Sequence, residues 1–253
     1  MILVIALNTF REVYRNKFFV SLFFISLMFI MFSLILGELT FEEQFKIMFD
    51  VGFASIHIFL IISSIFLGSF LVIRELESQT YQTLLTTPLT RNQFLIGKFI
   101  GLNLINLLML IILTFCLYLL LSLIGKFSAI NFSVICLLLF FESSLLICGA
   151  FLFSLLFSPF VSIFISMSLY FIGHWIEELN YFSTQSNSIF YKQLSSVVNF
   201  IVPHLYETNY RFLDYMFTTN INFVDLNFIL IHIVMWIITF LILSSIVFSK
   251  KSL

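Results

Sequence analysis

Residues 132–176 read FSVICLLLFFESSLLICGAFLFSLLFSPFVSIFISMSLYFIGHWI, and Glu142 is the only acidic, lysine or arginine residue in this stretch. A transmembrane helix needs about 20 mostly apolar residues to cross roughly 30 Å of hydrocarbon. The stretch is about twice that long, and Pro159 interrupts it, because proline cannot continue the hydrogen bonds of the preceding helix. It therefore predicts two membrane-spanning helices, 132–157 and 159–176, joined by a tight turn at Ser158-Pro159.

The remainder of the chain has the same apolar character. Of its 253 residues, 61% are hydrophobic and 10% are charged, whereas soluble domains are about 25% charged. Four further apolar runs cover 18–37, 51–73, 99–124 and 228–249, and they lack the two-residue alternation of a membrane β-barrel. We therefore expect an all-α polytopic membrane protein in which residues 1–253 form a single transmembrane domain of six helices. The sequence has no basic block that would indicate nucleic-acid binding.

The charged residues are divided unequally between the two sides that six spans create. With the N-terminus in the cytoplasm, eight lysine and arginine residues lie inside and four outside, while nine acidic residues lie outside. Cytoplasmic segments of membrane proteins carry an excess of lysine and arginine. We therefore expect both termini to be cytoplasmic.

Three segments outside the spans have their own patterns. Residues 3–17 predict an interfacial amphipathic helix, although an extension of the first span is the alternative. Residues 74–98 form the only sizeable cytoplasmic loop, with Pro88 at its centre and with Arg74, Arg91 and Lys98 expected near lipid phosphates. Residues 177–227 form an outer segment whose apolar spacing over 190–201 predicts a helix before Pro203. The apolar stripe of the first helix comprises Leu3, Ala6, Leu7, Phe10, Val13 and Tyr14.

Four stretches together carry a family resemblance: ALNTFREVYRNKFF at 6–19, ELESQTYQTLLTTPLTRNQFLIGKFIG at 75–101, the region 140–173, and IVPHL at 201–205. They resemble ABC transporter type-2 permeases, most closely the nitrous-oxide-reductase maturation, copper-processing subgroup. The resemblance implies a permease subunit of the bacterial cytoplasmic membrane that exports a substrate. It also implies two permease copies, a homodimer more readily than a heterodimer, with separate ATPase subunits and room for an outer accessory protein.

In that family the cytoplasmic loop contacts the ATPase, which gives the 74–98 loop a coupling role here. An ordinary polar connector is the alternative. The chain has no GxxxxGK[ST] motif, so it cannot hold nucleotide phosphates itself, and we expect no enzymatic activity and no cofactor. A membrane anchor that transmits motion without moving a substrate, and a small channel or carrier, remain open alternatives. The residues of the loop that match the family pattern are Glu75, Glu77, Thr80, Leu84, Leu85, Pro88 and Arg91.

Polar side chains within the predicted spans are few. Glu142 is acidic, and Asn103 and Asn106 carry amides. A carboxylate at the centre of a membrane costs at least about 2.5–3.5 kcal/mol, so Glu142 should have a partner. Two roles fit: gating or substrate contact, or a structural hydrogen bond to Ser143, Ser144, Asn103 or Asn106.

Four histidines, His57, His174, His204 and His232, fall toward the outer side of the predicted topology. A metal site or haem ligation would use such residues, but no two of them share a local motif such as HxxxH. The sequence also lacks the HExxH and GxSxG patterns of proteases. We therefore expect interfacial histidines with solvated rings and no metal.

Overall fold

The computed structural model describes residues 2–39, 43–77, 91–125, 129–186, 189–208 and 223–250, with only the backbone described at 71–77, 91 and 223–225. All the secondary structure in these residues is helical. Six helices are long and apolar enough to cross a membrane. The chain is therefore an all-α polytopic membrane protein with six transmembrane helices.

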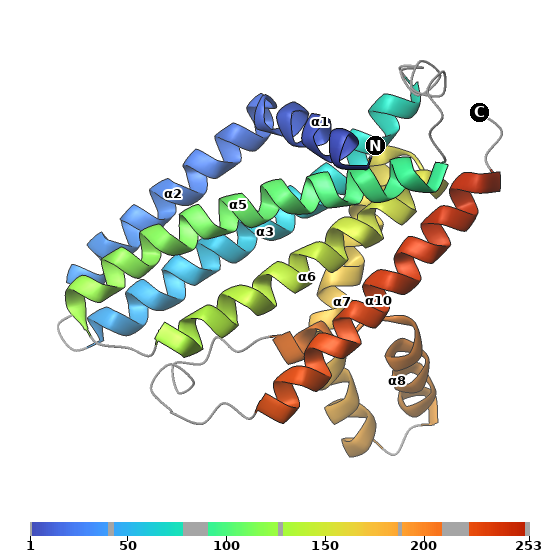
Figure 1. The fold of residues 1–253 in the computed structure, drawn as a ribbon. Coiled ribbons are helices and arrows are strands. Elements are labelled where there is room, and N and C mark those ends of the chain that lie inside the picture. The colour runs from blue at the N-terminus through green and yellow to red at the C-terminus, as the bar shows by residue number, and fades with distance from the viewer. Residues whose placement is uncertain are drawn as a thin grey trace.

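The elements follow one another as an up-and-down bundle with short additions at both ends (Figure 1). Their bounds are α1 Ile2–Tyr14, α2 Lys17–Glu38, α3 Gln44–Glu77, α5 Arg91–Ile124, α6 Ala129–Leu156, α7 Pro159–Gln185, α8 Ile189–Ile201, the 3₁₀ turn η1 Leu205–Thr208, and α10 Phe223–Lys250.

The two ends of the bundle differ in what they carry. Helix α1 and the last turn of α10 lie at one end, and α8 lies at the other (Figure 1). We name these the α1 end and the α8 end. Helix α1 is joined to α2 by a short turn in which the Asn16 side chain accepts a hydrogen bond from the Phe18 backbone N–H at 3.0 Å and caps α2.

Helices α3 and α6 form the centre of the bundle. In their apolar windows 72% and 78% of the residues are buried, against 22% in α2, α7 and α10. A methyl group added at Gly68 of α3 would lie 2.8 Å from both the Ala150 Cβ atom and the Ile147 carbonyl oxygen of α6. A residue without a side chain at 68 therefore permits the close contact between these two helices.

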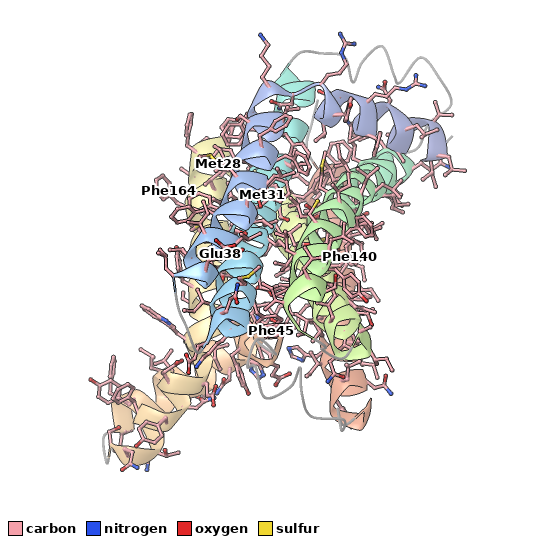
Figure 2. The ribbon with its side chains drawn as sticks, turned by 90° about the vertical axis from the view of Figure 1, so that its left-hand side faces the viewer. Met28, Met31, Glu38, Phe45, Phe140 and Phe164 are labelled. Atoms are coloured by element: carbon pink, nitrogen blue, oxygen red, sulfur yellow. The ribbon has the colours of Figure 1, made fainter. Side chains whose placement is uncertain are left out.

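The outer helices expose apolar side chains along the bundle. Met28 on α2 and Phe164 on α7 are 74% and 73% exposed, and both project from the bundle surface in Figure 2. In a membrane protein such side chains face lipid, or a neighbouring subunit, at no hydrophobic cost.

The turn between the fourth and fifth spans confirms the prediction from Ser158-Pro159. Helix α6 ends at Leu156, and α7 begins at Pro159 with extended backbone at Ser158. The helix predicted before Pro203 also appears, as α8. Helix α7 runs on to Gln185 and forms a hairpin with α8, in which the Asn180 Oδ1 atom accepts hydrogen bonds from Ser195 and Asn199 at 2.6 and 2.8 Å.

The residues of the apolar stripe predicted for the first helix differ in burial. Ala6 and Val13 are buried, whereas Leu3, Leu7 and Tyr14 are exposed, as apolar side chains of an interfacial helix are. Ile5 and Thr9 complete the buried face, which packs against α5. The apolar residues of α1 are thus divided between a face packed on α5 and exposed positions.

Candidate functional site

Glu142 lies near the middle of α6, the most buried helix of the bundle, and is only 2% exposed. A buried carboxylate is tolerated in a membrane protein when neighbouring groups hydrogen-bond to it. The structure supplies such groups from three other elements, α3, α7 and η1.

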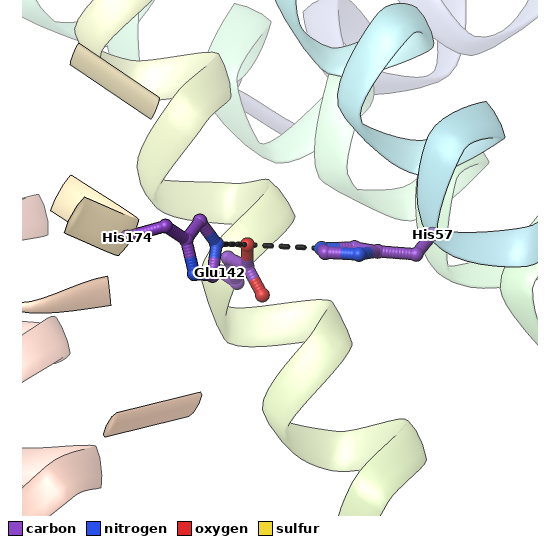
Figure 3. Close-up of side chains that lie close together, drawn as sticks. All are labelled: His57, Glu142 and His174. Atoms are coloured by element: carbon purple, nitrogen blue, oxygen red, sulfur yellow. Dashed lines mark hydrogen bonds and ion pairs between the residues drawn. The ribbon is translucent and has the colours of Figure 1, made fainter. Parts of the chain in front are cut away.

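Two histidines converge on one oxygen of this carboxylate. The Nε2 atoms of His57, on α3, and His174, on α7, each lie 3.0 Å from Glu142 Oε1. Figure 3 shows the carboxylate between the two imidazole rings. We call these three residues the His–Glu–His cluster. When the carboxylate is ionised, both imidazoles donate an Nε2–H to it, which fixes the tautomer of each ring.

The second oxygen of the carboxylate faces η1. Thr208 Oγ1 lies 3.1 Å from Glu142 Oε2 and 2.6 Å from the Leu205 carbonyl oxygen. A hydroxyl group has one hydrogen, so Thr208 donates to either the carboxylate or the carbonyl at one time. The 3₁₀ turn η1 therefore contacts the carboxylate oxygen that the two histidines leave free.

Packing around α7 brings η1 and His174 into position. A methyl group added at Gly173 would lie 2.9 Å from Leu205 Cδ1 and 3.0 Å from the Pro203 carbonyl oxygen. The Tyr170 ring packs edge-on against His174, with ring centroids 4.7 Å apart, and lies 5.9 Å from His57. Gly173 and Tyr170 thus hold the two sides of the cluster together.

The partners predicted for Glu142 are wrong. Ser143 and Ser144 each donate to the Phe140 carbonyl oxygen of their own helix. Asn103 donates to the Phe99 carbonyl oxygen, and Asn106 bonds to Ser63 and Ser64 on α3. Sequence neighbours on one helix point in different directions, and the carboxylate points toward α3 and α7 instead.

Asn106 nevertheless has a structural role in the same region. It is fully buried; its Oδ1 accepts from Ser63 Oγ and its Nδ2 donates to Ser64 Oγ, both at 3.2 Å. These bonds tie α5 to α3 two turns along from His57. The intramembrane residues Asn106 and Glu142 therefore both anchor α3.

The prediction of solvated histidine rings is wrong for two of the four histidines. His57 is 3% exposed and the His174 side chain is 16% exposed. His204 and His232 form a separate, partly exposed pair with stacked rings 5.2 Å apart. Near this pair, partial burial and the Glu207 carboxylate raise the pKa of Tyr206.

The α1 end contains a second close contact, between α1 and the start of α5. Methyl groups added at Gly97 and Gly101 would lie 2.9 Å from Ile5 Cβ and 2.7 Å from the Ala6 carbonyl oxygen. Glycines four residues apart allow two helix backbones to approach closely. Lys98 lies between them, is 2% exposed, and pairs with Glu12 at 3.5 Å. The prediction that Lys98 lies near lipid phosphates is therefore wrong.

The predicted coupling residues are only partly within the described structure. Glu75 and Glu77 lie in the last turns of α3, and Arg91 begins α5, with their side chains outside the described set. Thr80, Leu84, Leu85 and Pro88 lie outside the described residues. Their role stays a prediction.

Comparison with known protein families identifies the family of this chain. The profile of the ABC-2 family transporter proteins matches residues 10–184, which is more than half of the 253 residues. The chain belongs to the ABC-2 transporter family. The match runs from α1 to the last turn of α7, so it includes all three residues of the His–Glu–His cluster. A search of curated proteins gave no match.

Membership of the ABC-2 family fixes the general class of the protein. The family consists of transporter membrane subunits that work with an ATP-binding subunit and are not themselves catalytic. The chain is thus an ABC transporter permease, in agreement with its six transmembrane helices.

Proposed function

We propose that this ABC-2 permease works as a homodimer with a separate ATPase subunit, and that ATP-driven motion enters through residues 74–98 to drive export. The proposal includes a bacterial cytoplasmic membrane, both termini in the cytoplasm, and the nitrous-oxide-reductase maturation subgroup. The sequence resemblance over 75–101 and 140–173 supports the subgroup. The unequal division of lysine and arginine supports the orientation.

The way in which the two helices flanking the loop are held carries this proposal. Helices α3 and α5 each contain 34 residues, which corresponds to about 51 Å of helix. The hydrocarbon core is about 30 Å thick, so both helices are long enough to extend past it. Helix ends that extend past the hydrocarbon can be reached by a soluble ATPase.

Both helices are also held by the rest of the bundle. Some of the contacts lie near the loop, and others lie deep inside the bundle. The start of α5 is held by α1 through Gly97, Gly101 and the Lys98–Glu12 pair. Helix α3 carries His57, about 30 Å from Glu77 along the helix axis, and α3 and α5 are bonded through Asn106. A push on the loop would therefore move α1, α3 and α5 together and reach the His–Glu–His cluster.

The small number of charges in the spans favours a hydrophobic or amphipathic cargo. A small hydrophilic ion would need a polar path, whereas a hydrophobic or amphipathic substrate would not. The second candidate function is a subunit that transmits ATPase motion across the membrane without a substrate. The close contact between α3 and α6 at Gly68 favours this candidate, since it brings the two central helices of one copy together at that level.

A co-purification experiment tests the coupling role of the loop. The double variant Leu84→Asp/Leu85→Asp should insert into the membrane but lose its ATPase partner, because unpaired charges would enter an apolar groove at a cost of several kcal/mol. The matched control is Gln193→Asp/Ser196→Asp on the exposed face of α8, which should retain the ATPase. Wild-type recovery of the ATPase with the Leu84→Asp/Leu85→Asp protein would remove the main support for the proposed mechanism.

A further inference from the structure

We propose that His57, Glu142 and His174 form a binding site for one divalent transition-metal ion of the Zn²⁺ type. The three residues come from three different helices, α3, α6 and α7, yet their ligand atoms all lie within 4.8 Å of one another. Within the described residues this is the one group of three or more histidine, cysteine, aspartate or glutamate side chains with such an arrangement.

The ligand atoms need only a small adjustment to hold a tetrahedral ion. Zn²⁺ binds histidine nitrogen and carboxylate oxygen at about 2.0–2.2 Å, which places neighbouring ligand atoms about 3.3–3.5 Å apart. Two of the three separations, from Glu142 Oε1 to each Nε2 atom, are 3.0 Å. One ring nitrogen of each histidine lies within 4.8 Å of that of the other, so these two ligand atoms need to approach each other by at most about 1.5 Å.

The donor chemistry points to the same class of ion. Two imidazoles and one carboxylate form a ligand set that Zn²⁺ uses in proteins, with a fourth position left for water or a further ligand. Each Nε2 atom would bind the ion in its unprotonated form, and the ring hydrogen would move to Nδ1. Oxygen-seeking ions such as Mg²⁺ or Ca²⁺ fit less well, because two of the three donors are nitrogen.

Contacts around the three ligands match those of a supported metal site. Ligating carboxylates are themselves hydrogen-bonded in metal sites, and Thr208 Oγ1 lies 3.1 Å from Glu142 Oε2, the oxygen that the histidines leave free. The Tyr170 ring restrains His174 from the side. His174 is the most exposed of the three ligands, at 16% of its side chain against 3–4% for the other two.

The second histidine pair provides an internal control. His204 and His232 lie near Glu207, but His204 Nδ1 is 3.7 Å from the Glu207 carboxylate, and His232 Nε2 accepts the His204 backbone N–H at 3.4 Å. These donors do not converge on one point. Replacing this pair removes as many histidines as replacing His57 and His174, and leaves the three proposed ligands in place.

Metal binding by the full chain in detergent tests the proposal directly. After chelator treatment and addition of Zn²⁺, the desalted wild-type protein should retain one zinc per chain, measured by elemental analysis. Each of His57→Gln, Glu142→Gln and His174→Gln should weaken zinc binding more than about 100-fold, since even supporting residues of metal sites contribute 10–100-fold. The control His204→Gln/His232→Gln should bind zinc like the wild type.

Wild-type protein loaded with Co²⁺ gives a readout that does not depend on any variant folding. A tetrahedral nitrogen and oxygen site should give strong visible absorption that Zn²⁺ abolishes by competition. Absence of stoichiometric zinc, a thiolate-to-cobalt band, or equal loss of zinc in the His204→Gln/His232→Gln control would each overturn the site and leave a hydrogen-bonded triad only. The measurement needs no ATPase, so its result is independent of the Leu84→Asp/Leu85→Asp experiment.

Discussion

Helices α6 and α2 have similar apolar compositions and opposite surroundings. The apolar window of α6 has a mean hydropathy of 2.3 and is 78% buried, whereas that of α2 has a mean hydropathy of 2.7 and is 22% buried. Helix α3 resembles α6, since its window has a mean hydropathy of 2.1 and is 72% buried. Helices α5 and α10 are more apolar and less buried. In this bundle the two central helices are therefore not the most hydrophobic ones.

This lack of correlation between hydropathy and burial arises because the bundle is surrounded by lipid rather than water. Lipid tails are as apolar as leucine, so burying a leucine side chain gains little in a membrane, and association of helices depends on close packing and hydrogen bonds. The centre can therefore hold Glu142, His57 and Asn106, because neighbouring helices satisfy them. Helix α7 is an exception, because its apolar window has a low mean hydropathy of 1.5 and yet is only 22% buried. Its buried residues include Ser162, Ser166 and Gly173, which form a narrow stripe toward the neighbouring helices.

The largest expected effect is at the central carboxylate. Glu142→Leu should destabilise the protein by about 1–3 kcal/mol for each histidine N–H left without an acceptor. Glu142→Gln keeps an oxygen at the same position, so its loss of stability should be less than half that of Glu142→Leu. Thermal unfolding in detergent with a chelator present measures this without any contribution from metal. Equal losses in the two variants would mean that hydrogen bonding does not hold the centre together.

A smaller effect is expected from crowding the contact between α3 and α6. Gly68→Ala should destabilise the protein by about 1–3 kcal/mol, because its methyl group meets backbone and Cβ atoms at 2.8 Å. Gly149→Ala is the matched control on α6, since its methyl group would meet only the Phe240 ring at 3.6 Å. Both changes raise helix propensity by about 1 kcal/mol, so the difference in unfolding temperature isolates packing. The same unfolding temperature for both variants would contradict the close contact at Gly68.

The smallest effect is expected on the lipid-facing surface of α2. Met28→Ala, at a side chain 74% exposed, should change the free energy of unfolding by no more than about 0.5 kcal/mol. Leu145→Ala on α6, at a fully buried position, should cost about 2–5 kcal/mol by leaving a cavity. Thermal unfolding of both variants compares the two environments directly. A large loss for Met28→Ala would show that α2 packs against a partner rather than lipid.

Much of the architecture was predictable from sequence. The length of the apolar runs determines the six spans, because the bilayer thickness sets the length of a helix that crosses it. Pro159 determines the turn between α6 and α7, since proline has no backbone N–H to donate. The spacing of apolar residues before Pro203 correctly predicted α8.

The composition of the site was only half predictable. Glu142 could be singled out, because an acidic residue in a span is costly and needs a partner. Its partners could not be identified, because His57, His174 and Thr208 are 85, 32 and 66 residues away along the chain. A search for local motifs such as HxxxH cannot detect ligands that lie on separate helices. The one available signal was that both histidines fall inside or beside apolar runs.

The sequence by itself determined that the chain crosses the membrane six times and where it turns, because those properties depend on local length, hydropathy and backbone chemistry. Only the tertiary structure decided which helices lie at the centre, that Lys98 pairs with Glu12, and that two distant histidines meet at Glu142. In lipid every apolar helix face is equally acceptable to the solvent, so these choices depend on glycine contacts and hydrogen bonds between helices. The hydropathy of the sequence does not predict such contacts.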